Sequence, residues 1–66
     1  MRDDDADTAG DVYFEFTTIG AAVKVAAIDA KTGLEVVIVG PAGAAKADLE
    51  RLAVQKLKVR LARHQP

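Results

Sequence analysis

The sequence contains no cysteine, no serine and no tryptophan, and it has a single histidine, His64. Without cysteine there is no disulfide and no thiolate zinc site, and one histidine is too few for a histidine-based metal site. The side chains that most often act as catalytic nucleophiles are also missing. The sequence therefore predicts a protein that is not an enzyme and that binds no metal and no cofactor.

Long apolar runs are missing as well. The runs that are present are short, such as Val36 to Val39, whereas a membrane-spanning helix needs about 20 apolar residues. Met1 to Asp5 is acidic where a secretory signal peptide has a basic segment followed by an apolar one. We therefore expect a cytoplasmic protein without a membrane anchor.

The length of 66 residues allows one domain. Half of the residues are hydrophobic, but a domain of this size buries only about 60% of the surface that its unfolded chain exposes. The core is therefore marginal, and a partner chain or very good packing has to supply the missing stability.

Charge is distributed unevenly along the chain, although the formal net charge is only −1. Residues 1–20 hold one basic residue and six acidic ones, whereas residues 46–66 hold six basic residues and two acidic ones. Residues 1–10 show no hydrophobic period and little bulk, so we expect a disordered acidic tail there. Residues 11–66 are expected to form the single domain.

Two segments alternate in character from one residue to the next and are rich in β-branched or aromatic side chains, which is typical of strands. They are Val12 to Thr18 and Ala22 to Ile28, and Leu34 to Val39 is expected to form the third strand. A tight turn at Ile19-Gly20 is expected to join the first two strands. In the second connection, Asp29 starts a type I turn and Gly33 closes it in the left-handed region.

These turns predict which residues face each other in an antiparallel meander. The first hairpin pairs Phe14 with Val25, Phe16 with Val23, and Glu15 with Lys24, the last as an ion pair. The second hairpin pairs Ala27 with Val36, Val25 with Ile38, and Ala26 with Val37. One face then carries the predicted core: Val12, Phe14, Phe16, Val23, Val25, Ala27, Leu34, Val36 and Ile38.

The segment Gly40 to Gly43 is expected to end the sheet, and residues 44–63 are good helix formers. Acidic residues come early in this segment and basic residues late, as the helix dipole favours. The stripe predicted to lie on the sheet is Leu49, Leu52, Ala53, Leu57 and Leu61. The sequence therefore predicts an α+β fold, a three-stranded antiparallel β-meander followed by one C-terminal helix packed on one face (βββα).

One helix can cover only one face of this sheet, and the other face also carries apolar side chains. Tyr13, Ile28, Val37 and Val39 are expected to form an apolar patch there, and such patches usually mark an interface. The third strand is also an edge strand that could pair with another chain. We therefore expect a homo-oligomeric interaction module that uses these four residues.

The alternative is a nucleic-acid-associated protein that uses the basic helix. Lys56, Lys58, Arg60 and Arg63 supply four cations within eight residues, enough for several phosphate contacts. Against this, the cations alternate with apolar residues around the helix, which suits a solvated helix.

Three segments of the chain, Tyr13 to Gly20, Val23 to Asp29 and Thr32 to Val36, together resemble a family of short bacterial proteins of unknown function. In that family a three-strand meander leads through a Gly-Pro loop into one basic helix. The resemblance covers about Val12 to Ala62 and implies the same βββα fold. It implies no catalytic or binding residue.

Overall fold

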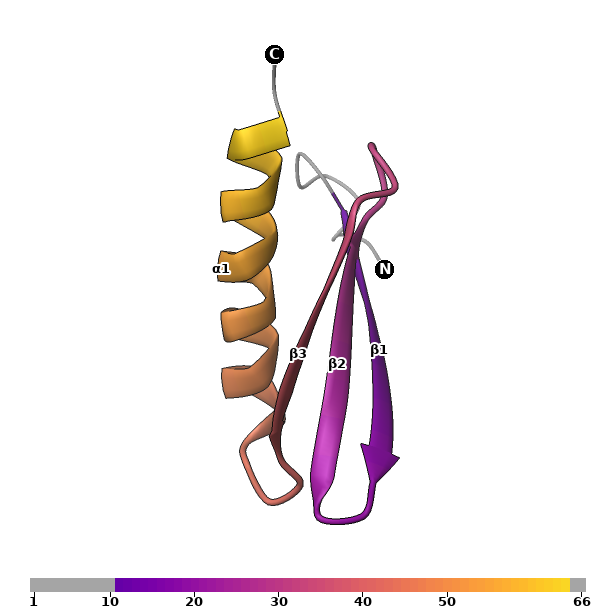
Figure 1. Ribbon diagram of the computed structural model, residues 1–66, viewed down its shortest axis with the longest axis vertical. Helices are drawn as coiled ribbons and strands as arrows, with labels where there is room; N and C mark the ends of the chain where they lie inside the picture. Colours follow the sequence, from indigo (N-terminus) through magenta and orange to yellow (C-terminus); the bar gives the residue numbers. More distant parts are fainter. Residues whose placement is uncertain (1–10, 65–66) are drawn as a thin grey trace.

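The computed structural model describes residues 11–64, which form three strands and one helix. The elements are β1 (Val12–Ile19), β2 (Ala22–Asp29), β3 (Glu35–Pro41) and α1 (Lys46–His64). The strands form one antiparallel sheet in the order β1-β2-β3 (Figure 1). The predicted βββα fold is confirmed. The tail predicted over residues 1–10 lies outside the described residues.

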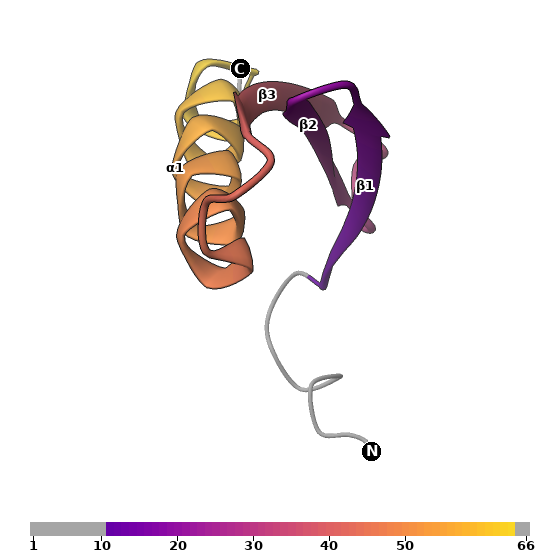
Figure 2. The same cartoon turned by 90° about the horizontal axis from the view of Figure 1, so that it is seen from below.

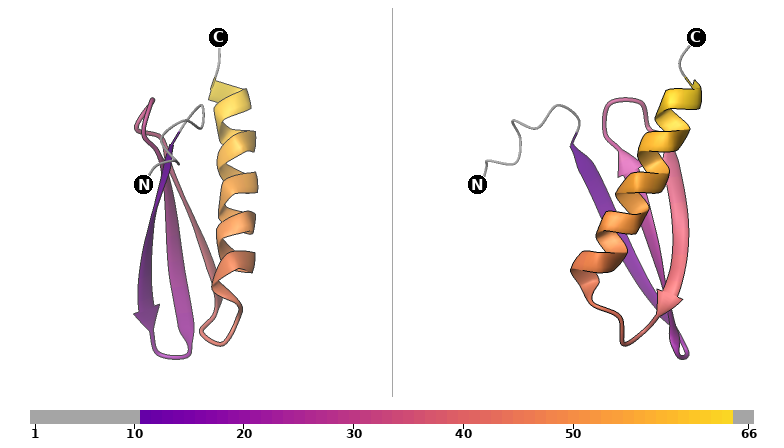
Figure 3. Two further views of the ribbon diagram at one scale, coloured as in Figure 1. Left: turned by 180° about the vertical axis from the view of Figure 1, so that it is seen from behind. Right: turned by 90° about the vertical axis from the view of Figure 1, so that its left-hand side faces the viewer.

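The sheet is arched, and α1 lies against its concave face (Figure 2). The helix packs on β2 and β3, and it crosses the strands obliquely (Figure 3). The first strand, β1, lies farthest from the helix in the arch (Figure 2). One face of the sheet is therefore covered unevenly, and the opposite face is not covered by any element of residues 11–64.

The core lies between α1 and the central part of the sheet. Its buried members are Val23, Val25, Ala27, Val36, Leu49, Ala53 and Leu57. Half-buried side chains surround them, among them Val12, Phe14 and Phe16 of β1. All nine sheet residues predicted for the core lie in this cluster, so the predicted core face is confirmed. The β1 members are less buried because the helix packs on the other two strands.

The register predicted for the first hairpin is wrong by two residues. Phe14 faces Ala27 and Phe16 faces Val25, and the turn lies at Gly20-Ala21. The reason is the backbone of Gly20, which has a φ of 61°. Tight hairpin turns need a positive φ at their first central position, and β-branched Ile19 adopts one only at a steric cost.

This shift also removes the predicted ion pair between Glu15 and Lys24. Glu15 faces Ala26, and Lys24 lies between Thr17 on β1 and Val39 on β3. A shift of two residues keeps every side chain on its face, because the side chains of a strand alternate with a period of two. The core face was therefore predicted correctly although the pairs across it were not.

The second hairpin has the predicted register, with Ala27 facing Val36 and Val25 facing Ile38. Its turn is also as predicted, since Gly33 has a φ of 78° and its N–H donates to the Asp29 carbonyl (2.7 Å). The Asp29 carboxylate accepts hydrogen bonds from the hydroxyl and the backbone N–H of Thr32, both at 2.8 Å. Asp29 is buried at this turn. Its side chain therefore stabilises the turn together with the glycine.

The third strand extends to Pro41, so the prediction that Gly40 and Pro41 end the sheet is wrong. The Asp29 N–H donates to the Leu34 carbonyl, and the Ala42 N–H donates to the Ala21 carbonyl. Even-numbered residues on this side of the hairpin therefore bond to the neighbouring strand. The backbone groups of the odd-numbered residues of β3 point away from β2. Pro41 is one of these residues, and its missing N–H costs no ladder bond.

The helix begins at Lys46, two residues later than predicted, and the Ala44 N–H closes a turn onto the Pro41 carbonyl before it (3.0 Å). The stripe that lies on the sheet follows a strict four-residue spacing: Leu49, Ala53, Leu57 and the half-buried Leu61. Leu52 was predicted in this stripe, but it is 53% exposed. It is one residue away from Ala53, a rotation of about 100°, which carries its side chain off the sheet.

Candidate interaction surface

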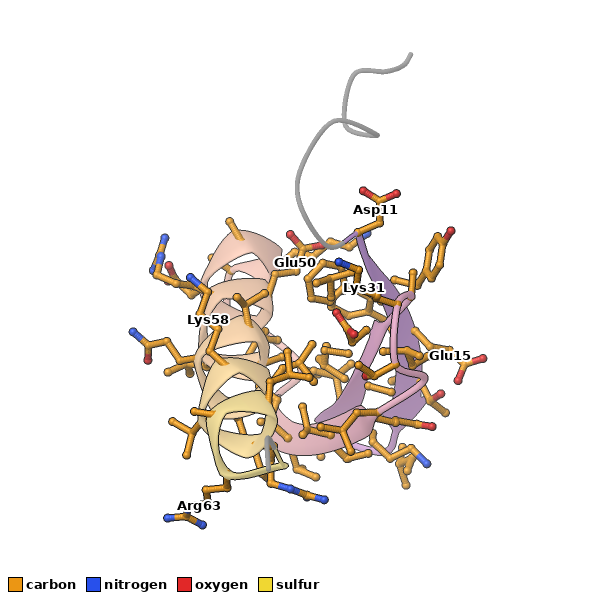
Figure 4. All side chains as sticks on the ribbon, turned by 90° about the horizontal axis from the view of Figure 1, so that it is seen from above. Asp11, Glu15, Lys31, Glu50, Lys58 and Arg63 are labelled. Atoms are coloured by element: carbon orange, nitrogen blue, oxygen red, sulfur yellow. The ribbon has the colours of Figure 1, made fainter. Side chains whose placement is uncertain are left out.

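The face of the sheet turned away from α1, here called the uncovered face, is mostly apolar. Alternation along the strands and the observed registers bring twelve side chains to it. Eight are apolar: Tyr13, Ile19, Ala22, Ala26, Ile28, Val37, Val39 and Pro41. The other four are Glu15, Thr17, Lys24 and Glu35, and Figure 4 shows Glu15 pointing away from the helix.

The structure brings the four predicted residues together on this face. Tyr13 faces Ile28 across the β1–β2 ladder, and Val37 and Val39 are adjacent on the same side of β3. Tyr13 is 61% exposed and Val39 68%, whereas Ile28 and Val37 are half-buried. The solvent-accessible apolar surface therefore lies mainly on the two outer strands.

The centre of the uncovered face is better shielded than expected. Ala26, which alternation places on this face, is only 2% exposed. It lies on the central strand between Glu15 and Val37, and these larger neighbours cover its methyl group.

Sequence reasoning missed one strongly exposed member of this face. Ile19 is 60% exposed and lies beside Ala22 in the last pair of the first hairpin. It was left out because the first strand was predicted to end at Thr18. The signal was present, since Ile19 continues the alternation of Tyr13 and Glu15 along β1.

The outer edge of β3 is occupied by a side chain of the helix. The Lys56 ammonium donates a hydrogen bond to the Val37 carbonyl oxygen at 2.7 Å. This carbonyl belongs to an odd-numbered residue, whose backbone groups point away from β2. A lysine at the edge of a sheet hinders pairing with another strand. The edge of β3, which the sequence predicts as a place where another chain could pair, is therefore partly protected.

The four predicted nucleic-acid contacts do not share one side of the helix. Lys56, Arg60 and Arg63 are separated by four and three residues and lie along one side. Lys58 lies elsewhere, and Figure 4 shows Lys58 and Arg63 pointing to different sides of α1. All four are exposed. The structure therefore gathers three of these cations and separates the fourth.

Another cation lies over an aromatic ring of the core face. The Lys46 ammonium is 4.7 Å from the centroid of the Phe16 ring. Such contacts are worth about 0.5–1 kcal/mol at exposed sites. This contact links the first turn of α1 to β1, the strand that lies farthest from the helix (Figure 2).

Within residues 11–64, no three His, Cys, Asp or Glu side chains come together in a group that could hold a metal ion. In the same part of the chain, no helix has both the length and the apolar character to cross a membrane.

Comparison with known proteins identifies a family. No curated protein and no solved structure matches the chain. One family model matches residues 9–64, which include all three strands and α1. Because this match spans most of the chain, the protein belongs to the family described as a domain of unknown function (DUF6898).

Proposed function

We propose that this protein is a small non-enzymatic interaction module that works as a homo-oligomer, with a second copy of the chain covering the uncovered face. The observation that carries the proposal is the exposure of three large apolar side chains there, 61% for Tyr13, 60% for Ile19 and 68% for Val39. Scattered single apolar residues are normal on a surface, but eight apolar side chains among the twelve on one face of a sheet favour an interface.

The energetic argument concerns the size of the domain. Burying a large apolar side chain is worth about 1.5–3 kcal/mol, whereas a core in a domain this small rarely supplies more than about 3–5 kcal/mol. Covering Tyr13, Ile19 and Val39 would therefore add an amount comparable with the whole expected margin. A second copy can do this without any additional sequence.

The charges on the uncovered face also suit a two-fold stack of two copies. Glu15 lies on β1, Glu35 on β3, and Lys24 on the central strand between them. When two such faces stack, the acidic residues of one copy can lie near Lys24 of the partner subunit. Lys24, which lies on the central strand, would then have an acidic partner inside the interface, and the acidic residues of the outer strands would lie nearer its edges.

The test is the mass in solution by sedimentation equilibrium at about 100 µM, where a complex of micromolar affinity is largely assembled. We expect at least twice the chain mass of 7.0 kDa. Val39→Glu should lower this mass, because it places a charge in the interface. Lys58→Glu, a charge change at an exposed position of the helix, should leave the mass unchanged. A wild-type mass near 7.0 kDa, or a mass that Val39→Glu does not lower, would contradict the proposal.

A second candidate is nucleic-acid association, favoured by the three cations that share one side of α1. Residues 11–66 carry eight Lys or Arg residues and six acidic ones, so the folded part is weakly basic. Binding through Lys56, Arg60 and Arg63 should weaken with salt, because phosphate contacts release counterions. Replacing the three by Ala should abolish a mobility shift of labelled duplex, whereas Lys58→Ala should not. No shift at low salt removes this candidate.

A further inference from the structure

Two more large apolar side chains are exposed, and both belong to α1. Leu52 is 53% exposed and Val59 is 51% exposed. They are seven residues apart, about two helical turns, and therefore lie on one side of the helix. Asp48 lies one turn before Leu52 and Arg63 one turn after Val59, and both are exposed. These four residues are here called the helix stripe.

The helix stripe reads the same from either end, because its members are separated by four, seven and four residues. An antiparallel second helix therefore places Leu52 opposite Val59 of the partner subunit. It also places Asp48 opposite Arg63 of the partner subunit. Apolar side chains then meet in the middle and opposite charges meet at both ends, as a self-complementary two-fold interface requires.

We propose that the helix stripe binds a second copy of this chain, helix against helix and antiparallel, about a two-fold axis that passes near Gln55 and Lys56. This goes beyond the association through the uncovered face, because it uses other side chains on another side of the molecule. Neither interface needs the other.

Charge complementarity is what identifies the occupant as a second copy. Within one chain, Asp48 and Arg63 are 15 residues apart, about 22 Å along the helix, so they cannot pair with each other. Asp48 does pair with Arg51 (2.9 Å), but their side chains are 60% and 65% exposed. An exposed pair of this kind contributes little stability and is easily exchanged, so Asp48 remains accessible to a partner.

The residues next to the axis leave room for this approach. The Lys56 ammonium is directed to the β3 edge by its hydrogen bond to Val37. The positive charges of the two copies are therefore drawn toward their own sheets. Gln55 is exposed and neutral and lies on the side of the stripe farther from the sheet. No like charges are forced together at the centre of the interface.

The absence of cysteine allows a direct test by cross-linking, which also captures a weak dimer. Gln55→Cys places one thiol close to the axis in each copy, and Lys58→Cys places it almost one turn farther along α1 and outside the helix stripe. Under mild oxidation we expect the Gln55→Cys disulfide dimer to form about tenfold faster, because association raises the local concentration of the thiols. Equal rates for the two variants would overturn the proposal.

Charge reversal tests the pairing itself. In the Gln55→Cys chain, Asp48→Lys and Arg63→Glu should each slow cross-linking several-fold, because like charges then meet at both ends. The two changes together should restore the rate, since the opposite charges are again paired between subunits. Helix content by circular dichroism checks that each variant is folded. A double variant that is as slow as the single ones would show that the two residues do not meet.

A last variant separates this proposal from the one for the uncovered face. Val39→Glu in the Gln55→Cys chain should lower the mass in solution and leave the rate of cross-linking unchanged. If Val39→Glu abolishes cross-linking while the charge reversals have no effect, the helix stripe is not an interface and the uncovered face is.

Discussion

Lys56 and Val37 are 19 residues apart in sequence, yet the ammonium of Lys56 donates a 2.7 Å hydrogen bond to the backbone carbonyl of Val37. This bond ties the middle of α1 to the outer edge of the sheet. The run Val36 to Val39 on that edge has high β-propensity and no charge. Such edges pair with other strands unless they are covered or charged. We therefore expect Lys56 to hinder this pairing along Val36 to Val39.

The first prediction concerns the loss of the hydrogen bond from Lys56 to Val37. Lys56→Met keeps the aliphatic stem of the side chain but loses the donor, so the Val37 carbonyl is open to another strand. We expect faster formation of thioflavin-positive aggregates on gentle heating. Lys58→Met is the matched control, because Lys58 is an exposed lysine of the same helix that makes no contact with the β3 edge. If both variants aggregate at the same rate, Lys56 does not protect the edge.

The second prediction concerns the close approach of strand and helix at Gly40. A Cβ atom at this position would lie 2.6 Å from Cδ2 of Leu49, which is buried in the core. Gly40→Ala should therefore lower the free energy of unfolding by about 1–3 kcal/mol, the usual cost of overpacking. Urea denaturation measures this loss. Gly43→Ala is the control, since a Cβ there meets nothing within 4 Å, and it should be no less stable than the wild type.

The third prediction tests the rotation of the helix. Leu57 is 1% exposed and Leu52 is 53% exposed, although both belong to the stripe predicted from the sequence. Leu57→Ala should cost about 2–5 kcal/mol, because it leaves a cavity in the core. Leu52→Ala should cost less than about 0.5 kcal/mol when the chain is dilute enough to be monomeric. Similar losses of stability for the two variants would mean that α1 is rotated.

The fourth prediction is a pH dependence. Hydrogen bonds from the Thr32 hydroxyl and then from the Thr32 N–H hold the pKa of Asp29 below its ordinary value of 3.8, against the opposing effect of burial. A carboxyl group with a lowered pKa in the folded state stabilises the fold above its unfolded pKa. This contribution is lost as the pH falls from 3.8 through the folded pKa.

Asp29→Asn should therefore be less stable than the wild type at neutral pH. The difference should shrink as the pH falls below about 4, because the wild-type carboxyl then becomes protonated as well. Urea denaturation from pH 7 to pH 2 measures both curves. A constant difference across this range would show that the charge of Asp29 does not contribute.

Much of the fold could be predicted, because residues that are close in sequence determine those parts of it. Alternation in Val12 to Thr18 and in Ala22 to Ile28 places each side chain on a face whatever the exact register. The turn from Asp29 to Gly33 carries its own hydrogen bonds and its own left-handed glycine. Of the candidate interface, Tyr13, Ile28, Val37 and Val39 follow from the same alternation.

What the sequence determined by itself is thus the order of elements, the two faces of the sheet and the second turn, because residues close in the chain decide them. The tertiary structure decided the rest. Because α1 crosses the strands obliquely, Leu52 is exposed and Lys56 reaches the edge of β3. Neither result depends on a local sequence pattern. The pairing of the first hairpin also escaped prediction, because alternation with a period of two is satisfied equally by registers two residues apart, and only the positive φ of Gly20 selects one of them.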